Sequence, residues 1–214
     1  MKTELIQGGY ALRVDLQAGE ELVAEPGAMI AMEGLDMKVG ASGGLMSAFR
    51  RCCLGGESAF LNTFTTATGG WMELATATSG VIVERTLAQG EKIYIKQGSW
   101  VAASGDVTMS LKFTGLKGMR TGQTTFLTCT AKEGDVKVWF CAGGKVITHE
   151  LEGNTVIVDN ENCVGYSSGL DWSVFRPGGT KARFVAGEGH TMKFTGSGTV
   201  WVQTNHGQPR PPAN

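Results

Sequence analysis

An internal repeat is the feature of this 214-residue sequence that most constrains its fold. Three stretches align without gaps, and each contains a glycine turn, an apolar strand, a polar turn and a second apolar strand. They span residues 19–31, 90–102 and 153–165. A repeat of this kind indicates that each copy is one supersecondary unit, whose apolar face is buried by its neighbours. The sequence therefore predicts three diverged copies of one β-unit in a single body.

A second repeated block predicts how the copies are connected. It occurs at residues 56–63, 122–129 and 187–194. Its last copy, residues 187–194, lies near the C-terminus. The copy of the first block that we match to it, residues 19–31, lies at the N-terminus. We therefore predict a circularly permuted repeat with adjacent chain ends, in a pseudo-threefold body that closes on itself and leaves no sheet edge exposed. The predicted body covers residues 1–206 and has three units: 2–40 with 188–204, 56–113, and 122–175.

The local patterns are those of an all-β fold with one short helix at most. Apolar and polar residues alternate over residues 107–113, and such runs recur roughly every 8–12 residues, as in a sandwich or barrel. Glycine turns separate the runs, and Gly196-Ser197-Gly198 is one of them. Only residues 45–54 have a helical pattern. The proline-rich residues 207–214 are predicted to form a flexible tail.

Two motifs typical of metal and redox sites are absent from the sequence. There is no His-Glu-x-x-His and no Cys-x-x-Cys. A His₃ metal site would need all of His149, His190 and His206, and the last of these adjoins the tail. We therefore predict no metal, no cofactor and no enzymatic activity. A hydrolase or metal enzyme without a recognisable motif is the alternative.

The cysteines indicate a reducing compartment. The five cysteines have no spacing typical of a disulfide scaffold, so we predict reduced thiols and a cytoplasmic protein. No apolar run is long enough to span a membrane, and the N-terminus has no apolar run of a secretory signal. Cys52-Cys53 follow Arg50-Arg51, whose charge lowers a thiol pKa and favours a reactive site. With no histidine nearby to act as a base, a packing role for this pair is the favoured interpretation.

The tryptophans are predicted to pack in the core or at a subunit interface. Trp139 and Trp201 occupy equivalent strands, and Trp71 falls close to the same place in the remaining copy. An RNA-stacking surface needs aromatic residues beside basic ones, whereas Trp139 and Trp201 have apolar neighbours. The net charge of −1 likewise gives no general attraction to nucleic acid, and no specific nucleic-acid partner is predicted.

Positive charge is concentrated in the three connectors between successive units. These connectors are residues 41–58, 113–123 and 175–189, and only Glu57 and Glu188 oppose their basic residues. We predict one basic, glycine-rich face and an acidic face opposite. The favoured interpretation of the basic face is a solvated loop surface, or a seam between the oppositely charged faces of neighbouring subunits. Binding of an anionic lipid surface or an acidic partner is the alternative hypothesis. The candidate binding residues are Arg50, Arg51, Lys117, Arg120, Arg176, Lys181 and Arg183.

Several of these segments resemble the altered-inheritance-of-mitochondria family of bacterial and mitochondrial proteins. The resemblance lies in Pro26-Gly27-Ala28-Met29, Gly55-Gly56-Glu57-Ser58, Phe60-Leu61-Asn62-Thr63 and Val200-Trp201-Val202-Gln203-Thr204. It implies tandem units similar to the tryptophan RNA-binding attenuation protein, a short double-stranded β-helix, and a tendency to self-associate. The third connector departs from the family pattern, because residues 176–186 lack the expected Gly-Gly-Glu-Gly run. The resemblance supplies no catalytic residue.

These observations favour a non-catalytic scaffold or interaction protein that forms homo-oligomers. The alternative is a binding module for a small anionic ligand, an anionic membrane surface or RNA, either at the basic connectors or in grooves between units. A fold resemblance alone is weak support for either function.

Overall fold

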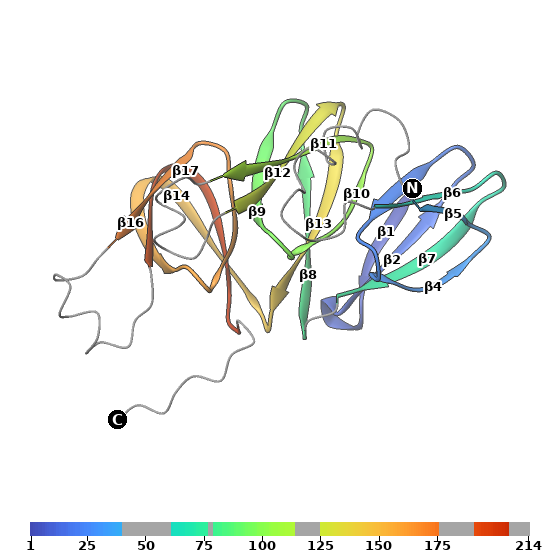
Figure 1. Cartoon of the computed structure of the whole chain (residues 1–214), viewed down its shortest axis with the longest axis horizontal. Helices are drawn as coiled ribbons and strands as arrows, with labels where there is room; N and C mark the ends of the chain where they lie inside the picture. The colour runs from blue at the N-terminus through green and yellow to red at the C-terminus, as the bar shows by residue number, and fades with distance from the viewer. Residues whose placement is uncertain (40–60, 77–78, 114–124, 176–190, 206–214) are drawn as a thin grey trace.

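The computed structural model describes residues 1–39, 61–76, 79–113, 125–175 and 191–205. In this part of the chain all regular structure is β-strand, except for one 3₁₀ segment, η1 (Gln7–Gly9). The all-β prediction is therefore confirmed. The strands form three antiparallel sheets along the long axis of the molecule (Figure 1). The helix predicted over residues 45–54 and the predicted tail lie outside the described residues.

Three consecutive units of the chain repeat the same six strand positions, which we name A to F in chain order. β1 (Lys2–Ile6) precedes the first unit. In unit 1 the positions are β2 (Ala11–Leu16), β3 (Glu21–Ala24), β4 (Met29–Glu33), β5 (Asp36–Val39), β6 (Asn62–Thr65) and β7 (Gly70–Ala75). In unit 2 they are β8 (Gly80–Leu87), β9 (Lys92–Lys96), β10 (Trp100–Ser104), β11 (Asp106–Phe113), β12 (Thr125–Glu133) and β13 (Val136–Gly143). In unit 3, β14 (Val146–Asp159) provides A and B, β15 (Cys163–Ser167) is C, β16 (Leu170–Phe175) is D, and β17 (Thr191–Gln203) provides E and F.

Strand pairing follows one rule throughout the molecule. Within each unit, A pairs with F, F with C, D with E, and E with B. Position B of one unit then pairs with position C of the next, as β3 does with β10 and β9 with β15. The two larger sheets therefore each join D, E and B of one unit to C, F and A of the following unit.

The predicted circular permutation is wrong. β17 pairs with β14, β15 and β16, all within unit 3, and does not complete a unit with residues 2–40. β1 and β17 accordingly lie toward opposite ends of the molecule, so the predicted meeting of the chain ends and the closed pseudo-threefold body are also wrong (Figure 1). The strand pattern instead places the units at about residues 11–75, 80–143 and 146–203.

The turn predicted at Gly196-Ser197-Gly198 is also wrong. Gly196 and Gly198 both lie inside β17. Their φ values of 112° and 151° allow the strand to bend and continue from position E to position F. A β-carbon on Gly196 would also lie 2.3 Å from the carbonyl oxygen of Gly169 on the neighbouring segment. A glycine pair that reads as a turn in the sequence therefore marks a bend in a single strand.

The core lies at the junctions between units. Each of the three buried apolar clusters combines residues from more than one unit, so no unit buries its core alone. Trp139 and Trp201 stand at equivalent places in position F and are buried, as predicted, against the preceding unit. In unit 1, which has no preceding unit, Glu73 takes that place, and Trp71 lies two residues earlier in the strand.

Position C carries the same irregularity in every unit. A β-bulge adds one residue to β4, β10 and β15 between equivalent partners, and the extra residues are Ile30, Val101 and Val164. Bulges bend a strand and redirect its side chains. Here Val101 and Val164 point into the preceding junction, where both are buried.

Candidate functional site

The predicted basic site lies outside the described residues. All seven candidate residues belong to the connectors: Arg50, Arg51, Lys117, Arg120, Arg176, Lys181 and Arg183. The strand ends that flank the connectors are described, however. Each connector joins position D to position E of one unit, and the strand residues beside it pair across the two strands: Val39 with Asn62, Phe113 with Thr125, and Phe175 with Thr191. The three connectors therefore start and end at equivalent places in the three units.

The described cysteines are free thiols, and two of them are fully enclosed. Burial raises the pKa of Cys129 and of Cys163 to about 12, so both remain protonated at neutral pH. A protonated, enclosed thiol is a poor nucleophile. These cysteines are therefore core residues, whereas Cys52 and Cys53 lie outside the described residues.

Metal binding finds no support in the described part of the chain. No group of three or more histidine, cysteine or carboxylate side chains there could hold a metal ion. His149 lies on β14 opposite Val200, while His190 and His206 lie outside the described residues. Among the described residues, no helix has the length and apolar character needed to cross a membrane.

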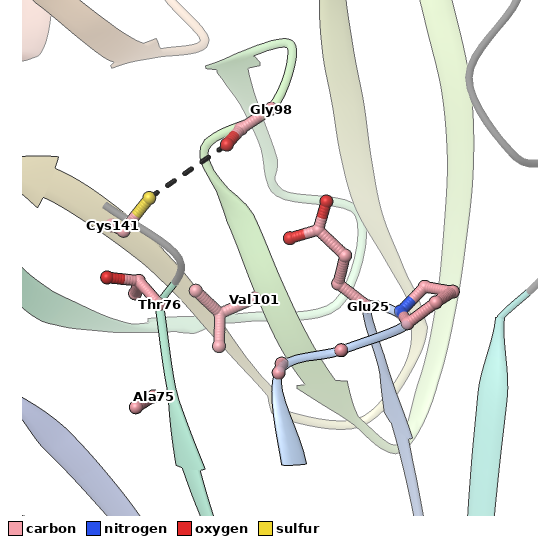
Figure 2. A pocket seen from close by; sticks show the side chains of 9 residues that line it. Glu25, Ala75, Thr76, Gly98, Val101 and Cys141 are labelled. Atoms are coloured by element: carbon pink, nitrogen blue, oxygen red, sulfur yellow. Dashed lines mark hydrogen bonds between the residues drawn. The ribbon is translucent and has the colours of Figure 1, made fainter. Parts of the chain in front are cut away.

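One small cavity opens at the junction of units 1 and 2 (Figure 2). Its volume is about 160 Å³, and the turn between β3 and β4 forms one wall. Glu25, Thr76 and Cys141 are its side chains with polar atoms, and the Cys141 Sγ lies 4.0 Å from the carbonyl oxygen of Gly98. Figure 2 shows the Glu25 carboxylate on the other side of Val101 from the Cys141 thiol.

The matching place at the next junction carries longer polar side chains. At the matching place of the next junction, Gln203 replaces Cys141 and Lys96 replaces Glu25. The amide of Gln203 and the ammonium of Lys96 both donate hydrogen bonds to the carbonyl oxygen of Glu161 there, at 2.9 and 3.1 Å. No imidazole lines the cavity, and ligand pockets usually enclose roughly 300–1,000 Å³. The cavity therefore has room for only a few atoms and lacks a base beside its thiol.

A polar cluster holds β1, β8 and β13 together at the same junction. The Glu84 carboxylate accepts hydrogen bonds from the Trp139 indole nitrogen at 2.8 Å and the Lys137 ammonium at 2.9 Å. The Thr3 hydroxyl contacts both Glu84 and Lys137. Burial would raise the pKa of Glu84, but these hydrogen bonds outweigh burial and hold the pKa below its usual value. The cluster has a structural role, because all its members are paired with one another.

At each end of the molecule, a strand with exposed apolar side chains has one edge without a partner strand among the described residues. β10 and β15 are buried along their whole length, whereas no residue of β4, at the same position C, is fully buried. Ile30 and Met32 are 57% and 37% exposed, while the equivalent Val101 and Ala103 are each 1% exposed. At the other end, Ile157 on β14 is 46% exposed. Sequence reasoning missed this surface, although the ungapped alignment of residues 19–31 with 90–102 places Ile30 opposite Val101.

Comparison with known proteins gives a family and a fold. The family described as "Mitochondrial biogenesis AIM24" matches residues 6–205. An uncharacterized protein of Streptococcus pyogenes serotype M6 is 27% identical over 202 residues, which cover 90% of this chain and 80% of that protein. A crystal structure of a Streptococcus pyogenes protein superposes with a TM-score of 0.73 at 22% identity, covering 95% of this chain and 92% of the other. At that identity the superposition shows a shared fold.

Proposed function

We propose, from the premise that the chain belongs to the mitochondrial biogenesis AIM24 family, that it is a non-catalytic scaffold that assembles with further copies of itself. The observation that carries the proposal is the outer edge of β4, which has no partner strand among the described residues. Its side chains Ile30 and Met32 are exposed, although the same strand position is buried in both other units. Exposed apolar residues on a strand with an unpaired edge favour pairing with another chain.

The chemistry of the described residues supports a role without catalysis. The inter-unit cavity combines a carboxylate, a hydroxyl and a thiol but no imidazole. The thiols of Cys129 and Cys163 are enclosed and protonated. We place the scaffold in the cytoplasm, because the enclosed Cys129 and Cys163 are free thiols, as is usual in a reducing compartment.

Native mass spectrometry and light scattering after size-exclusion chromatography test the proposal. We expect assemblies at multiples of the 22.6 kDa chain mass, with larger species favoured at higher protein concentration. Protein purified from its own host also reports any retained ligand. A monomer at every concentration contradicts the scaffold function.

An anion-binding surface is a second candidate function. It is favoured by the seven basic residues of the connectors, which start and end at equivalent places in the three units. Such a surface binds vesicles of anionic lipid in a salt-sensitive manner. Co-sedimentation of the wild type and of Arg50→Glu/Arg51→Glu with anionic vesicles tests it, with neutral vesicles as the control. Binding that is absent, or equal for both proteins, contradicts this candidate.

A further inference from the structure

The two larger sheets have the same strand order, and each end of the molecule carries half of it. Both sheets run D–E–B of one unit followed by C–F–A of the next. Unit 1 presents a C–F–A half with no preceding D–E–B half, because the first sheet ends at β4. Unit 3 presents a D–E–B half in β16, β17 and residues 155–159 of β14, and this half has no following C–F–A half. Among the described residues, the two half-sheets are complementary and both are unpaired at their outer edges.

The register of the B–C ladder is identical at both internal junctions. Ala102 pairs with Ala24 at the first junction, and the equivalent Gly165 pairs with Ile95 at the second. The next two pairs also correspond in the repeat alignment: Ala103 with Val23 and Tyr166 with Tyr94, then Ser104 with Leu22 and Ser167 with Ile93. Two junctions with different side chains thus share one geometry, which is set by the backbone and by the bulge in position C.

We propose that β4 of one copy pairs antiparallel with residues 155–159 of β14 in a second copy, and so completes a third sheet of the D–E–B–C–F–A order. This inference rests on the proposed scaffold function and specifies its interface. The equivalences of the repeat fix the register. The intermolecular pairs are Ala31 with Val158, Met32 with Ile157, and Glu33 with Val156.

The exposed apolar side chains lie where this register needs them. Met32 and Ile157, 37% and 46% exposed in one chain, become direct partners across the new ladder. Their counterparts at the internal junctions, Ala103 with Val23 and Tyr166 with Tyr94, are buried or half-buried. Ile30 is the bulged residue of β4, and its counterparts Val101 and Val164 are buried against the preceding unit. The second copy supplies that missing preceding unit.

The charged residues beside β4 are of the same kinds as those at the junction of units 1 and 2. Arg13 pairs with Glu73 at 3.0 Å, and its guanidinium lies 3.7 Å above the Trp71 ring. At the internal junction, the same three strand places hold Glu84, Trp139 and Lys137. Each set contains one cation, one anion and one tryptophan in a different order.

The contact is heterologous, because each chain uses a different strand at each end. β4 and β14 lie toward opposite ends of the long axis, so the contact joins separate copies head to tail (Figure 1). Such a contact repeats until the assembly closes into a ring or continues as a filament. Because the two ends of a chain use different strands, a substitution that blocks pairing at one end leaves the strand at the other end able to pair.

Two single variants test this property. Met32→Lys places a charge on β4, and Ile157→Lys places one on β14. The proposed ladder would bury either charge, and a charge at such a position opposes edge pairing. Both residues are exposed in the single chain, so both variants are expected to fold, and circular dichroism checks this. Tyr10→Lys, a 59% exposed position outside the strands, is the matched control. The masses are measured by light scattering for each variant alone and for an equimolar mixture of the two blocked variants.

We expect the wild type and Tyr10→Lys to form assemblies, each blocked variant to be a monomer, and the mixture to form a one-to-one dimer and nothing larger. If Ile157→Lys assembles while Met32→Lys does not, β4 pairs with itself and the heterologous ladder is wrong. If both variants assemble like the wild type, the interface lies elsewhere, although the scaffold function stands. A monomeric wild type overturns both proposals.

Discussion

Replacing Trp139 by phenylalanine measures how strongly the first junction depends on one charged hydrogen bond. Trp139 is fully buried, and its indole nitrogen donates to the Glu84 carboxylate at 2.8 Å. Phenylalanine keeps one ring in the core but removes the donor and leaves a small void. Loss of a hydrogen bond to a charged group costs about 1.5–3 kcal/mol, and the void adds about 1 kcal/mol. We therefore expect Trp139→Phe to lower the free energy of unfolding by about 2–4 kcal/mol at pH 7.

The pH dependence separates the hydrogen bond from the void. The pKa of Glu84 is lower in the folded protein than its ordinary value of 4.5, so the unfolded chain binds the proton more readily. The stability that Glu84 contributes is therefore fully present above the unfolded pKa, and it is lost as the pH falls through the folded pKa. Removing the Trp139 donor brings the folded pKa closer to the unfolded value. The difference between wild type and Trp139→Phe is thus largest at neutral pH and shrinks in acid.

Urea unfolding at neutral and acidic pH provides the assay, with Trp201→Phe as the control. Trp201 occupies the equivalent place at the second junction and is equally buried, but the charge near its ring is the Arg85 guanidinium at 5.2 Å. Trp201→Phe therefore measures the void without the loss of a bond to a carboxylate. A Trp139→Phe effect that is the same at both pH values, or no larger than that of Trp201→Phe, would falsify the assigned role of Glu84.

Two further predictions concern the second junction and the enclosed thiols. Gly165→Ala should lower the free energy of unfolding by about 1–3 kcal/mol in a urea titration, because its β-carbon would lie 2.5 Å from the Tyr94 carbonyl oxygen; an unchanged midpoint contradicts this packing. In a variant whose other three cysteines are serine, Cys129 and Cys163 should not react with a thiol reagent at pH 8 until the protein is unfolded, because their pKa values are about 12. Rapid labelling of the native protein contradicts their burial.

The sequence predicted the units but not their connection. The alternation of side chains and the aligned segments identified residues 19–31, 90–102 and 153–165, which form positions B and C of the three units. Which blocks pair with one another depends on contacts between distant segments, and local patterns carry no record of these contacts. The predicted units 56–113 and 122–175 each join positions E and F of one unit to positions A to D of the next. The prediction thus began every unit at position E instead of position A, which left E and F of unit 3 to be matched with the N-terminal residues.

The exposed edge of β4 could not be predicted from the sequence either, for a different reason. Ile30 in β4 and Val101 in β10 are both apolar and align with each other. Their difference in exposure depends on whether another unit precedes them in the chain, which is a property of the whole arrangement. The sequence concentrates basic residues in the three connectors relative to the rest of the chain, but these connectors lie outside the described residues. Charge patterning identified a candidate surface, while the pairing of strands identified the open edge of β4 on which the proposed interface rests.

The shared register of the junctions also affects how such a protein can change during evolution. Each unit presents strand B to its successor and receives strand B of its predecessor on strand C, always with the same spacing. A duplicated unit inserted between two others would therefore find both neighbours in the geometry it already has. After the loss of a whole unit, strand B of the unit before it could likewise pair with strand C of the unit after it. The number of units in a chain can thus drift by duplication or deletion without a new junction having to arise.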